Sequence, residues 1–224
     1  MPGCGAVTSS APGPLAPLYP FLYDAGSSVD IVADAEESVV TKAREIIELR
    51  ERVLLEQADA LRSCAADIGA RLAQGGRVLT FGNGGSSTDA LALAHLFTAP
   101  PADAVPVPAL CITTDVATLT ALSNDVDFEV AIARQLAVIA RPSDVAIALS
   151  TSGGSRNVLR ALDAACSGGL LTVGFAGYDG GRMGEDDRID HLFVVPSSSV
   201  HRIQEAQTTL YHVLWELVQG LLRG

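Results

Sequence analysis

The sequence predicts an α/β fold built on a doubly wound, parallel β-sheet. Short apolar runs alternate with stretches of helical periodicity from about residue 77 to the end of the chain. Helices of this length between strands provide the crossover connections that parallel pairing requires. Hydrophobic residues make up 48% of the 224 residues and charged residues 18%, a composition that suits one globular domain with a sizeable core.

The segment before the first predicted strand has two parts. Residues 1–30 are rich in Pro, Gly and Ser, and we expect a flexible N-terminal arm there. Between residues 33 and 74 apolar residues recur every three or four positions, which predicts helix. This stretch is long for one helix, so we expect two helices or a bent one, ended by the pair Gly75–Gly76. We find no linker after it and expect residues 31–224 to form a single domain.

Five short apolar runs in the remaining sequence predict buried strands. They cover residues 77–82 (RVLTFG), 107–112 (VPALCI), 144–150 (DVAIALS), 170–177 (LLTVGFAG) and 191–196 (HLFVVP). The helices predicted between and after them cover residues 86–97, 155–166 and 200–222. The last of these helices places Ile203, Leu210 and Leu214 on one apolar stripe.

Charge and cysteine content limit the class of partner. The net charge of −11 at pH 7 argues against a nucleic-acid groove or an anionic membrane as the main partner. A small phosphorylated ligand stays open, because backbone amides bind phosphate without any Lys or Arg. The four cysteines lack CxxC spacing, which indicates reduced thiols. With no long apolar run and no signal-peptide pattern, we expect a cytoplasmic protein without a membrane partner.

The stretch GNGGSS, from Gly82 to Ser87, follows the first predicted strand. Its glycines allow a ligand to approach the backbone closely, and its serines are suited to cap the helix that follows. The stretch matches neither GxGxxG nor GxxxxGK[ST], which argues against a Rossmann dinucleotide site and a Walker nucleotide site. Taken alone, the turn is equally well explained as a simple strand–helix connection.

The stretch STSGGSRN, from Ser150 to Asn157, repeats this pattern after the third predicted strand. Ser150, Thr151, Ser152 and Ser155 carry four hydroxyl groups within six residues. Ligands of open parallel sheets bind beyond the carboxyl ends of the strands. Two Ser/Gly turns at that edge therefore predict a phosphate cradle rather than two coincidental helix caps.

Four blocks of the sequence resemble the SIS (sugar isomerase) domain family. They read FGNGGSSTDA, TTDVATLTALSND, ALSTSGGSRNV and RIQEAQTTLYHVLWELV, and the match runs in order from about residue 35 to 222. The most similar subgroup is that of the phosphoheptose isomerases, which convert sedoheptulose 7-phosphate to a heptose 7-phosphate. The resemblance implies a flavodoxin-like, three-layer α/β/α sandwich. It also implies a homotetramer with active sites between subunits.

The resemblance further implies which residues bind the substrate. The residues expected at the phosphate are Ser150, Thr151, Ser152 and Ser155. The residues expected along the sugar and its hydroxyl groups are Asn83, Gly84, Gly85, Ser86, Asp115 and Gln204. In the phosphoheptose isomerases a Gln and a His of the last helix help to hold zinc, and these fall on Gln204 and His212.

The helix after the glycine turn departs from the family pattern. Phosphoheptose isomerases read similarly to DAQHFAEEL, where the His and the second Glu hold zinc and the Glu transfers protons. This chain reads DALALAHLF from Asp89, so the two positions fall on Ala92 and Leu96, which do neither. Gln204 and His212 lie about 12 Å apart along a helix. Two such ligands are fewer than zinc normally requires, and we expect no tight zinc site.

His212 and His201 remain as candidate catalytic residues. His212 occupies a family site position, whereas His201 opens the last predicted helix and faces either the pocket or solvent. His95 points about 100° away from Leu96 on a helix and is interpreted as a surface or interface histidine.

Two functions stay open at this point. The first is a sugar-phosphate isomerase of the phosphoheptose type, in which His212 and His201 carry protons without a tight zinc ion. The second is a non-catalytic phosphosugar sensor or protein-assembly factor of the same fold. The overall resemblance favours the first function, and the apolar residues at Ala92 and Leu96 favour the second.

Overall fold

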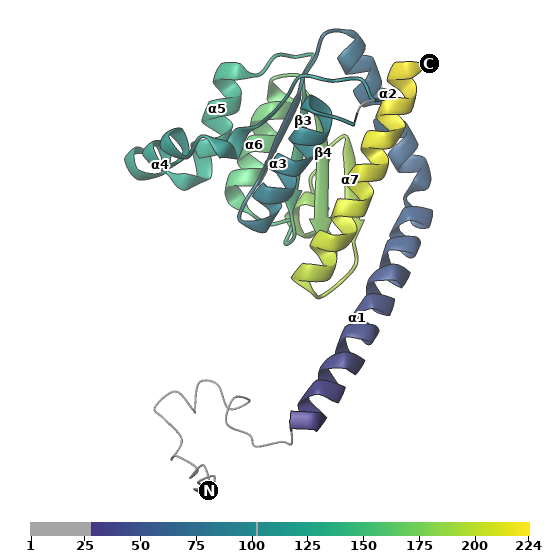
Figure 1. The fold of residues 1–224 in the computed structure, drawn as a ribbon. Helices are drawn as coiled ribbons and strands as arrows, with labels where there is room; N and C mark the ends of the chain where they lie inside the picture. The colour runs from purple at the N-terminus through teal and green to yellow at the C-terminus, as the bar shows by residue number, and fades with distance from the viewer. Residues whose placement is uncertain (1–27, 102) are drawn as a thin grey trace, which may run out of the picture. The chain divides into compact units, whose positions relative to one another are not determined.

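The computed structural model describes residues 28–101 and 103–224 (Figure 1). Most of the expected N-terminal arm lies outside the described residues. By its internal contacts the chain divides into two units, Met1–Glu45 and Ile46–Gly224. The described part of the first unit is the beginning of helix α1 (Ser28–Glu56), and the sheet belongs to the second unit.

The elements follow the predicted alternation. Helix α1 and helix α2 (Ala58–Ala73) precede the sheet, so of the two expected alternatives the segment forms two helices rather than one bent helix. The strands are β1 (Val78–Gly82), β2 (Ala109–Cys111), β3 (Val145–Ser150), β4 (Leu171–Gly177) and β5 (His191–Val195). The later α-helices are α3 (Gly85–Thr98), α4 (Val116–Asp125), α5 (Ala131–Ile139), α6 (Arg156–Ser167) and α7 (Val200–Arg223). Short 3-10 turns are η2 (Ile112–Thr114), η3 (Phe128–Val130) and η4 (Gly181–Met183). Among the described helices, none combines the length and the apolar character that crossing a bilayer demands.

The strands form one sheet in the order β2-β1-β3-β4-β5, and every neighbouring pair is parallel. Strands β1 and β3 lie side by side, with Val78 opposite Val145 and Gly82 opposite Leu149. This order is that of flavodoxin-like doubly wound sheets, in which ligands bind where the chain reverses direction across the sheet. The predicted fold class is confirmed, and all carboxyl ends of the strands meet at one edge.

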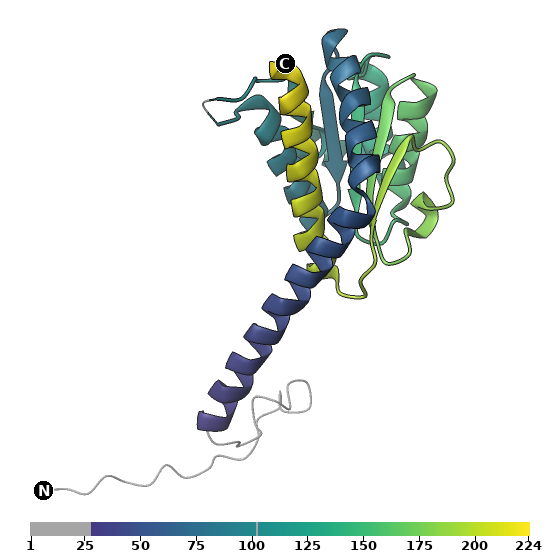
Figure 2. The same cartoon turned by 90° about the vertical axis from the view of Figure 1, so that its right-hand side faces the viewer.

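Alternate residues of β3 point to opposite faces of the sheet. Val145, Ile147 and Leu149 belong to an apolar cluster that includes residues of α2, α3 and α7. Ala146 and Ala148 belong to a second cluster, with residues of α5 and α6. Figures 1 and 2 show these helices covering the two faces of the sheet. Because both faces are covered, the central strands are apolar at nearly every position, which is why they stand out in the sequence.

The structure differs from the sequence prediction in the segment between β2 and β3. Helices α4 and α5 lie there, and the sequence analysis predicts neither of them. Helix α4 contains no buried residue, so its apolar residues Val116, Leu119 and Leu122 do not form a core-facing stripe. Strand β2 is also shorter than the predicted run of residues 107–112. Pro108 has no N–H to donate to a neighbouring strand, and the chain leaves the sheet in η2 at Ile112.

The amino edge of the sheet is held by a buried carboxylate. Arg77 and Asp144 directly precede β1 and β3, and Arg77 Nη2 lies 2.6 Å from Asp144 Oδ2. The backbone N–H groups of Arg77 and Arg141 donate to the same carboxylate at 2.9 and 3.0 Å. Burial acts to raise the pKa of Asp144, but the hydrogen bonds from Arg77 and Arg141 outweigh it and lower this pKa. Asp144 therefore stays ionised and fully bonded in the folded protein.

Candidate functional site

The two Ser/Gly turns lie together at the carboxyl edge of the sheet, because β1 and β3 are neighbours. Asn83 belongs to the first Ser/Gly turn, and Asn157 lies in the first helical turn of α6. Their side-chain amides exchange two hydrogen bonds of 2.8 Å each. Asn157 is buried, so the pair is a fixed connection between the turns. The structure therefore brings the two predicted stretches to one place.

The loop between β3 and α6 presents a group of hydroxyls. Ser150 Oγ lies 3.3 Å from Ser155 Oγ and 3.5 Å from Ser152 Oγ. The backbone N–H of Gly154 donates to Ser152 Oγ at 3.2 Å. Ser155 is the N-cap residue of α6, yet no side chain accepts a hydrogen bond from the helix N-terminus. Hydroxyls beside an uncapped helix N-terminus are suited to bind an anion such as phosphate.

Turn η4 packs directly against this loop. An ideal Cβ atom on Gly153 would lie 2.0 Å from the carbonyl oxygen of Gly180, so only glycine fits there. The backbone N–H of Met183 donates to the carbonyl oxygen of Gly153 at 2.9 Å. The hydroxyl loop is therefore held in place by the connection that follows β4.

The serines of the first Ser/Gly turn do not cap α3, although their residue type suits them to that position. The N-cap residue is Gly84, at φ +52°, and no side chain accepts a hydrogen bond from this helix N-terminus. Ser87 Oγ instead lies 2.6 Å from Thr113 Oγ1, and Ser86 is buried. The N-terminus of α3 thus faces the edge of the sheet with backbone groups alone, which leaves it available to a ligand.

Helix α7 approaches the first turn closely. An ideal Cβ atom on Gly85 would lie 2.1 Å from Gln204 Nε2. One turn further along α7, Thr208 Oγ1 donates to the carbonyl oxygen of Gln204 at 2.9 Å. The structure therefore brings Gln204 to the glycine turn, although the two are distant in the sequence.

His212 has a defined tautomer in this arrangement. Its Nδ1 lies 2.7 Å from the carbonyl oxygen of Thr208. A carbonyl oxygen only accepts, so Nδ1 carries a proton and donates it. In the neutral ring this leaves Nε2 with the lone pair that a general base requires.

Asp89 is a polar group of this region that the sequence analysis misses. It lies four residues after Gly85, so both face the same side of α3. Burial raises the pKa of Asp89, and a hydrogen bond with Thr208 of α7 offsets part of this effect. The sequence shows that Asp89 follows the glycines by one helical turn. It does not show that α7 packs against α3 there, and this packing is what places Asp89 beside Thr208.

Ala92 and Leu96 continue the same side of α3 as Gly85 and Asp89. Ala92 is exposed, and Leu96 is half-buried against the apolar cluster. His95 is exposed on α3, and His201 is exposed in the first turn of α7. Beyond Asp89, the side of α3 that holds Gly85 is therefore apolar, since it continues with Ala92 and Leu96.

Asp115 lies in a different environment from the two turns. It caps α4, where it accepts hydrogen bonds from Thr118 N at 3.0 Å and from Thr118 Oγ1 at 2.6 Å. These hydrogen bonds lower the pKa of Asp115. Asp115 also lines a hollow of about 620 Å³ whose other lining includes Leu110, Ile112 and Val138. Its hydrogen bonds thus go to α4 rather than to either Ser/Gly turn.

Comparison with known proteins gives a consistent result. The family model described as the SIS domain matches residues 43–177. The chain belongs to the SIS domain family. Within the SIS domain proteins, it is 43% identical over 190 residues to a phosphoheptose isomerase of Desulfovibrio desulfuricans, covering 84% of this chain and 89% of the relative. A phosphoheptose isomerase of Aquifex aeolicus is 40% identical over 188 residues, covering 83% and 97%.

A solved structure of the same SIS type agrees with this assignment. The phosphoheptose isomerase of Neisseria gonorrhoeae superposes with a TM-score of 0.77 at 29% sequence identity. The superposition covers 83% of this chain and 99% of that one. The resemblance that the sequence blocks indicate is therefore confirmed at the level of the family and the fold.

The side chains of this chain do not fit the zinc ion that the resemblance implies. Among residues 28–101 and 103–224, no three His, Cys, Asp or Glu side chains come close enough to hold a metal ion. Gln204 and His212 are the two remaining candidates, and zinc sites normally have three or more protein ligands. The described residues therefore supply fewer ligands than a zinc ion requires.

Proposed function

We propose that this protein binds a phosphorylated seven-carbon sugar and interconverts its ketose and aldose forms, as a phosphoheptose isomerase does. The observation that carries the proposal is the hydroxyl loop of residues 150–155, joined to the glycine turn by the Asn83–Asn157 amide pair. The relatives at 40% identity and above support the choice of a sugar phosphate over other anions.

The phosphate group of the substrate is assigned to the loop after β3. Ser150, Thr151, Ser152 and Ser155 would donate their hydroxyl protons to phosphate oxygens beside the N-terminus of α6. The sugar chain would extend from there along the glycine turn, which comprises Asn83, Gly84, Gly85 and Ser86. Gln204, which borders this turn, would bind a sugar hydroxyl. Asp115 would reach the sugar from the start of α4, because its carboxylate is exposed and ionised.

Isomerisation requires a base beside the carbonyl group of the sugar. In the ketose, the base takes a proton from carbon 1, the electrons of that C–H bond form the C1=C2 double bond, and the carbonyl electrons move to O2, which gives an enediolate. A proton then passes from O1 to O2, and the base returns its proton to carbon 2, which gives the aldose. We assign the base to Nε2 of His212, because the hydrogen bond from Nδ1 to Thr208 places the lone pair of the neutral ring on that atom. His201 is the second candidate, from the first turn of the same helix.

We also propose that Ala92 and Leu96 stand where other phosphoheptose isomerases carry a zinc-binding His and a catalytic Glu. The side of α3 that holds Gly85 and Asp89 next to α7 continues through both positions. With an alanine and a leucine there, proton transfer has to come from α7. A proton-transferring residue on α7 in place of one on α3 is the feature in which the chain would differ from its relatives.

The proposed active form is a homotetramer with sites between subunits. Leu110 and Val138 are exposed beside the hollow of about 620 Å³, although both are large and apolar. Apolar surface of this kind supports a subunit contact. Asp115 lines the same hollow, so a neighbouring subunit placed there would lie beside a residue assigned to the sugar.

The alternative is a non-catalytic phosphosugar sensor or assembly factor of the same fold. The apolar side of α3 at Ala92 and Leu96 favours it, because neither side chain transfers protons. In this alternative the hydroxyl loop and the glycine turn still bind the sugar phosphate.

Turnover of sedoheptulose 7-phosphate tests the proposal. Protein of measured metal content is mixed with the ketose, with and without added zinc, and aldose formation is followed by NMR. We expect aldose to form at a rate that does not depend on zinc. Line broadening of the sugar without any aldose would overturn the isomerase and leave the sensor. A sugar that neither broadens nor reacts would overturn both.

Restoring the missing pair tests the assignment of positions 92 and 96. The double variant Ala92→His with Leu96→Glu is expected to bind zinc, because a His and a Glu four residues apart share one side of a helix. The single variant Ala92→His provides one ligand fewer and is the matched control. Zinc content equal in the two variants would contradict the assignment.

A further inference from the structure

A second group of polar side chains lies outside the site described above, on the outer side of α6. A hollow of about 400 Å³ is lined there by Arg156, Arg160, Arg182, Arg188, Glu129 and Asp163. The chain has 15 Lys and Arg residues and a net charge of −11. Four of these basic residues therefore meet at one hollow of an acidic protein, and the proposed isomerisation uses none of them.

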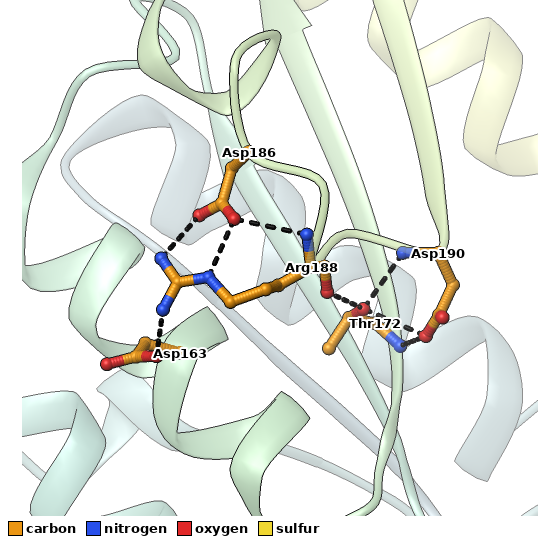
Figure 3. Close-up of polar contacts among 5 residues, drawn as sticks. All are labelled: Asp163, Thr172, Asp186, Arg188 and Asp190. Carbon is orange, nitrogen blue, oxygen red and sulfur yellow. Dashed lines mark hydrogen bonds and ion pairs between the residues drawn. The ribbon is translucent and has the colours of Figure 1, made fainter.

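Two of the four arginines are paired with carboxylates. Arg156 Nη1 lies 2.7 Å from Glu129 Oε1. The guanidinium group of Arg188 binds Asp186 in a forked manner, with Nε at 2.8 Å from Oδ1 and Nη2 at 3.0 Å from Oδ2. Its Nη1 atom donates to Asp163 of α6, so carboxylates lie at two edges of this guanidinium (Figure 3).

The position of Arg188 is fixed by the backbone as well. Thr172 Oγ1 of β4 donates to the carbonyl oxygen of Arg188 at 2.9 Å, and Asp190 Oδ2 accepts from the backbone N–H of Thr172 at 2.8 Å (Figure 3). The segment that carries Arg188 is thus tied to the sheet. One wall of the hollow is consequently preorganised, which lowers the entropy cost of binding a ligand.

Arg160 and Arg182 complete the charge of the hollow. Among the described residues, neither guanidinium group forms a hydrogen bond or ion pair, and both side chains are exposed. Glu129, Asp163 and Asp186 are bonded to Arg156 and Arg188, and the charge of Asp127 also acts on Arg156. The N–H donors of Arg160 and Arg182 are therefore the ones left for a ligand in the hollow. Guanidinium groups bind phosphate oxygens through two parallel hydrogen bonds, which distinguishes them from lysine ammonium groups.

We propose that this arginine hollow is a second anion site, which binds a diphosphate-bearing metabolite through Arg160 and Arg182. Its volume of about 400 Å³ is larger than a single phosphate group needs and leaves room for a second one. The site shares α6 with the hydroxyl loop, since Arg156 directly follows Ser155. Arg182 lies in η4, whose Met183 N–H is bonded to Gly153 of that loop. An anion held here is therefore connected to the hydroxyl loop of residues 150–155 through α6 and through η4.

Calorimetric titration with inorganic pyrophosphate tests the proposal on the full chain. Wild-type protein is expected to bind one pyrophosphate per chain at physiological salt. The double variant Arg160→Gln with Arg182→Gln is expected to bind about 100-fold more weakly, because each lost charge-assisted interaction weakens binding about tenfold. Neither guanidinium group has a hydrogen bond or ion pair among the described residues, so these substitutions remove only the longer-range attraction between Arg182 and Asp186. The matched control is Arg62→Gln, which removes a guanidinium group from the surface of α2.

A second variant separates this site from the hydroxyl loop. Ser152→Ala with Ser155→Ala is expected to leave pyrophosphate binding unchanged while sedoheptulose 7-phosphate binding falls. The proposal is overturned if pyrophosphate does not bind to the wild type, or if the Arg160/Arg182 variant binds it as tightly as the wild type does. The proposal is also overturned if the serine variant no longer binds pyrophosphate, because the anion then occupies the hydroxyl loop in the wild type.

Discussion

The two edges of the sheet use polar residues in opposite ways. At the amino edge, the Asp144 carboxylate is buried and accepts hydrogen bonds from Arg77 and from the backbone of Arg141. At the carboxyl edge, the hydroxyl of Ser150 lies 3.5 Å from that of Ser152 and 3.3 Å from that of Ser155, which are long hydrogen bonds. One edge satisfies its polar groups internally, and the other leaves them beside two uncapped helix N-termini.

This contrast separates stability from function. A buried carboxylate that loses its bonds costs the fold free energy, because its desolvation is then not compensated. Loosely bonded hydroxyls contribute little to folding and bind a ligand that brings its own charge. Substitutions at the amino edge should therefore change stability with little change in chemistry, and substitutions at the carboxyl edge should do the reverse.

The largest expected effect is at His212. Asparagine at this position keeps a donor for the Thr208 carbonyl and removes the Nε2 lone pair, so His212→Asn should lower kcat by about 10²–10⁴-fold, the usual contribution of a general base. The thermal midpoint should change little. His95→Asn on the exposed side of α3 is the control and should retain activity. If both variants turn over at the wild-type rate, the base is not His212.

The hydroxyl loop should show the next largest effect. Ser152→Ala with Ser155→Ala is expected to weaken sedoheptulose 7-phosphate binding by about 100-fold or more, because two hydrogen bonds to a charged group are lost. Binding is measured by calorimetry, and unfolding by urea should give a nearly unchanged midpoint. Ser167→Ala, at the other end of α6, is the control. A large loss of stability in the loop variant would contradict the separation of the two edges.

At the amino edge the expected effect is on folding. Asp144→Asn should lower the free energy of unfolding by about 2–3 kcal/mol, because the buried ion pair with Arg77 is broken. Activity per folded molecule should stay near that of the wild type. Asp67→Asn, which removes the exposed partner of His191, should cost less than about 1 kcal/mol. If both variants lost the same free energy of unfolding, the buried Asp144 carboxylate would stabilise the fold no more than an exposed ion pair does.

The pH dependence of this difference gives a finer test. The pKa of Asp144 is lowered in the folded state, so its contribution is fully present above the ordinary Asp pKa of about 3.9 and disappears as the pH falls through the folded value. The stability difference between wild type and Asp144→Asn should therefore be constant near neutral pH and shrink on acidification below about pH 4. Urea unfolding at several pH values measures it, and a difference that grows on acidification would contradict the assignment.

The sequence predicts the sheet far better than it predicts the segment between β2 and β3. Strand β3 is buried on both faces, so its composition alone identifies it. Helix α4 has no buried residue, so core packing imposes no pattern on its sequence. Packing against neighbours determines such segments, and a single sequence does not contain that information directly.

The candidate site, too, is predictable from the sequence only in part. Its two Ser/Gly turns are local patterns, which a sequence displays at fixed spacing. The approach of Gln204 to Gly85 and the raised pKa of Asp89 depend on how α7 packs against α3. The residue types of Ser86 and Ser87 suit a helix cap, but Gly84 takes the N-cap position of α3, since its positive φ favours glycine.

The most direct test of the account is proton exchange at the sugar without metal. Metal-free wild-type protein and the His212→Asn variant are incubated with sedoheptulose 7-phosphate in D₂O, and deuterium at carbon 1 is followed by NMR. The account predicts exchange by the wild type above the buffer rate, and none above that rate by the variant. Exchange that appears only when zinc is added, or that persists in His212→Asn, would contradict it.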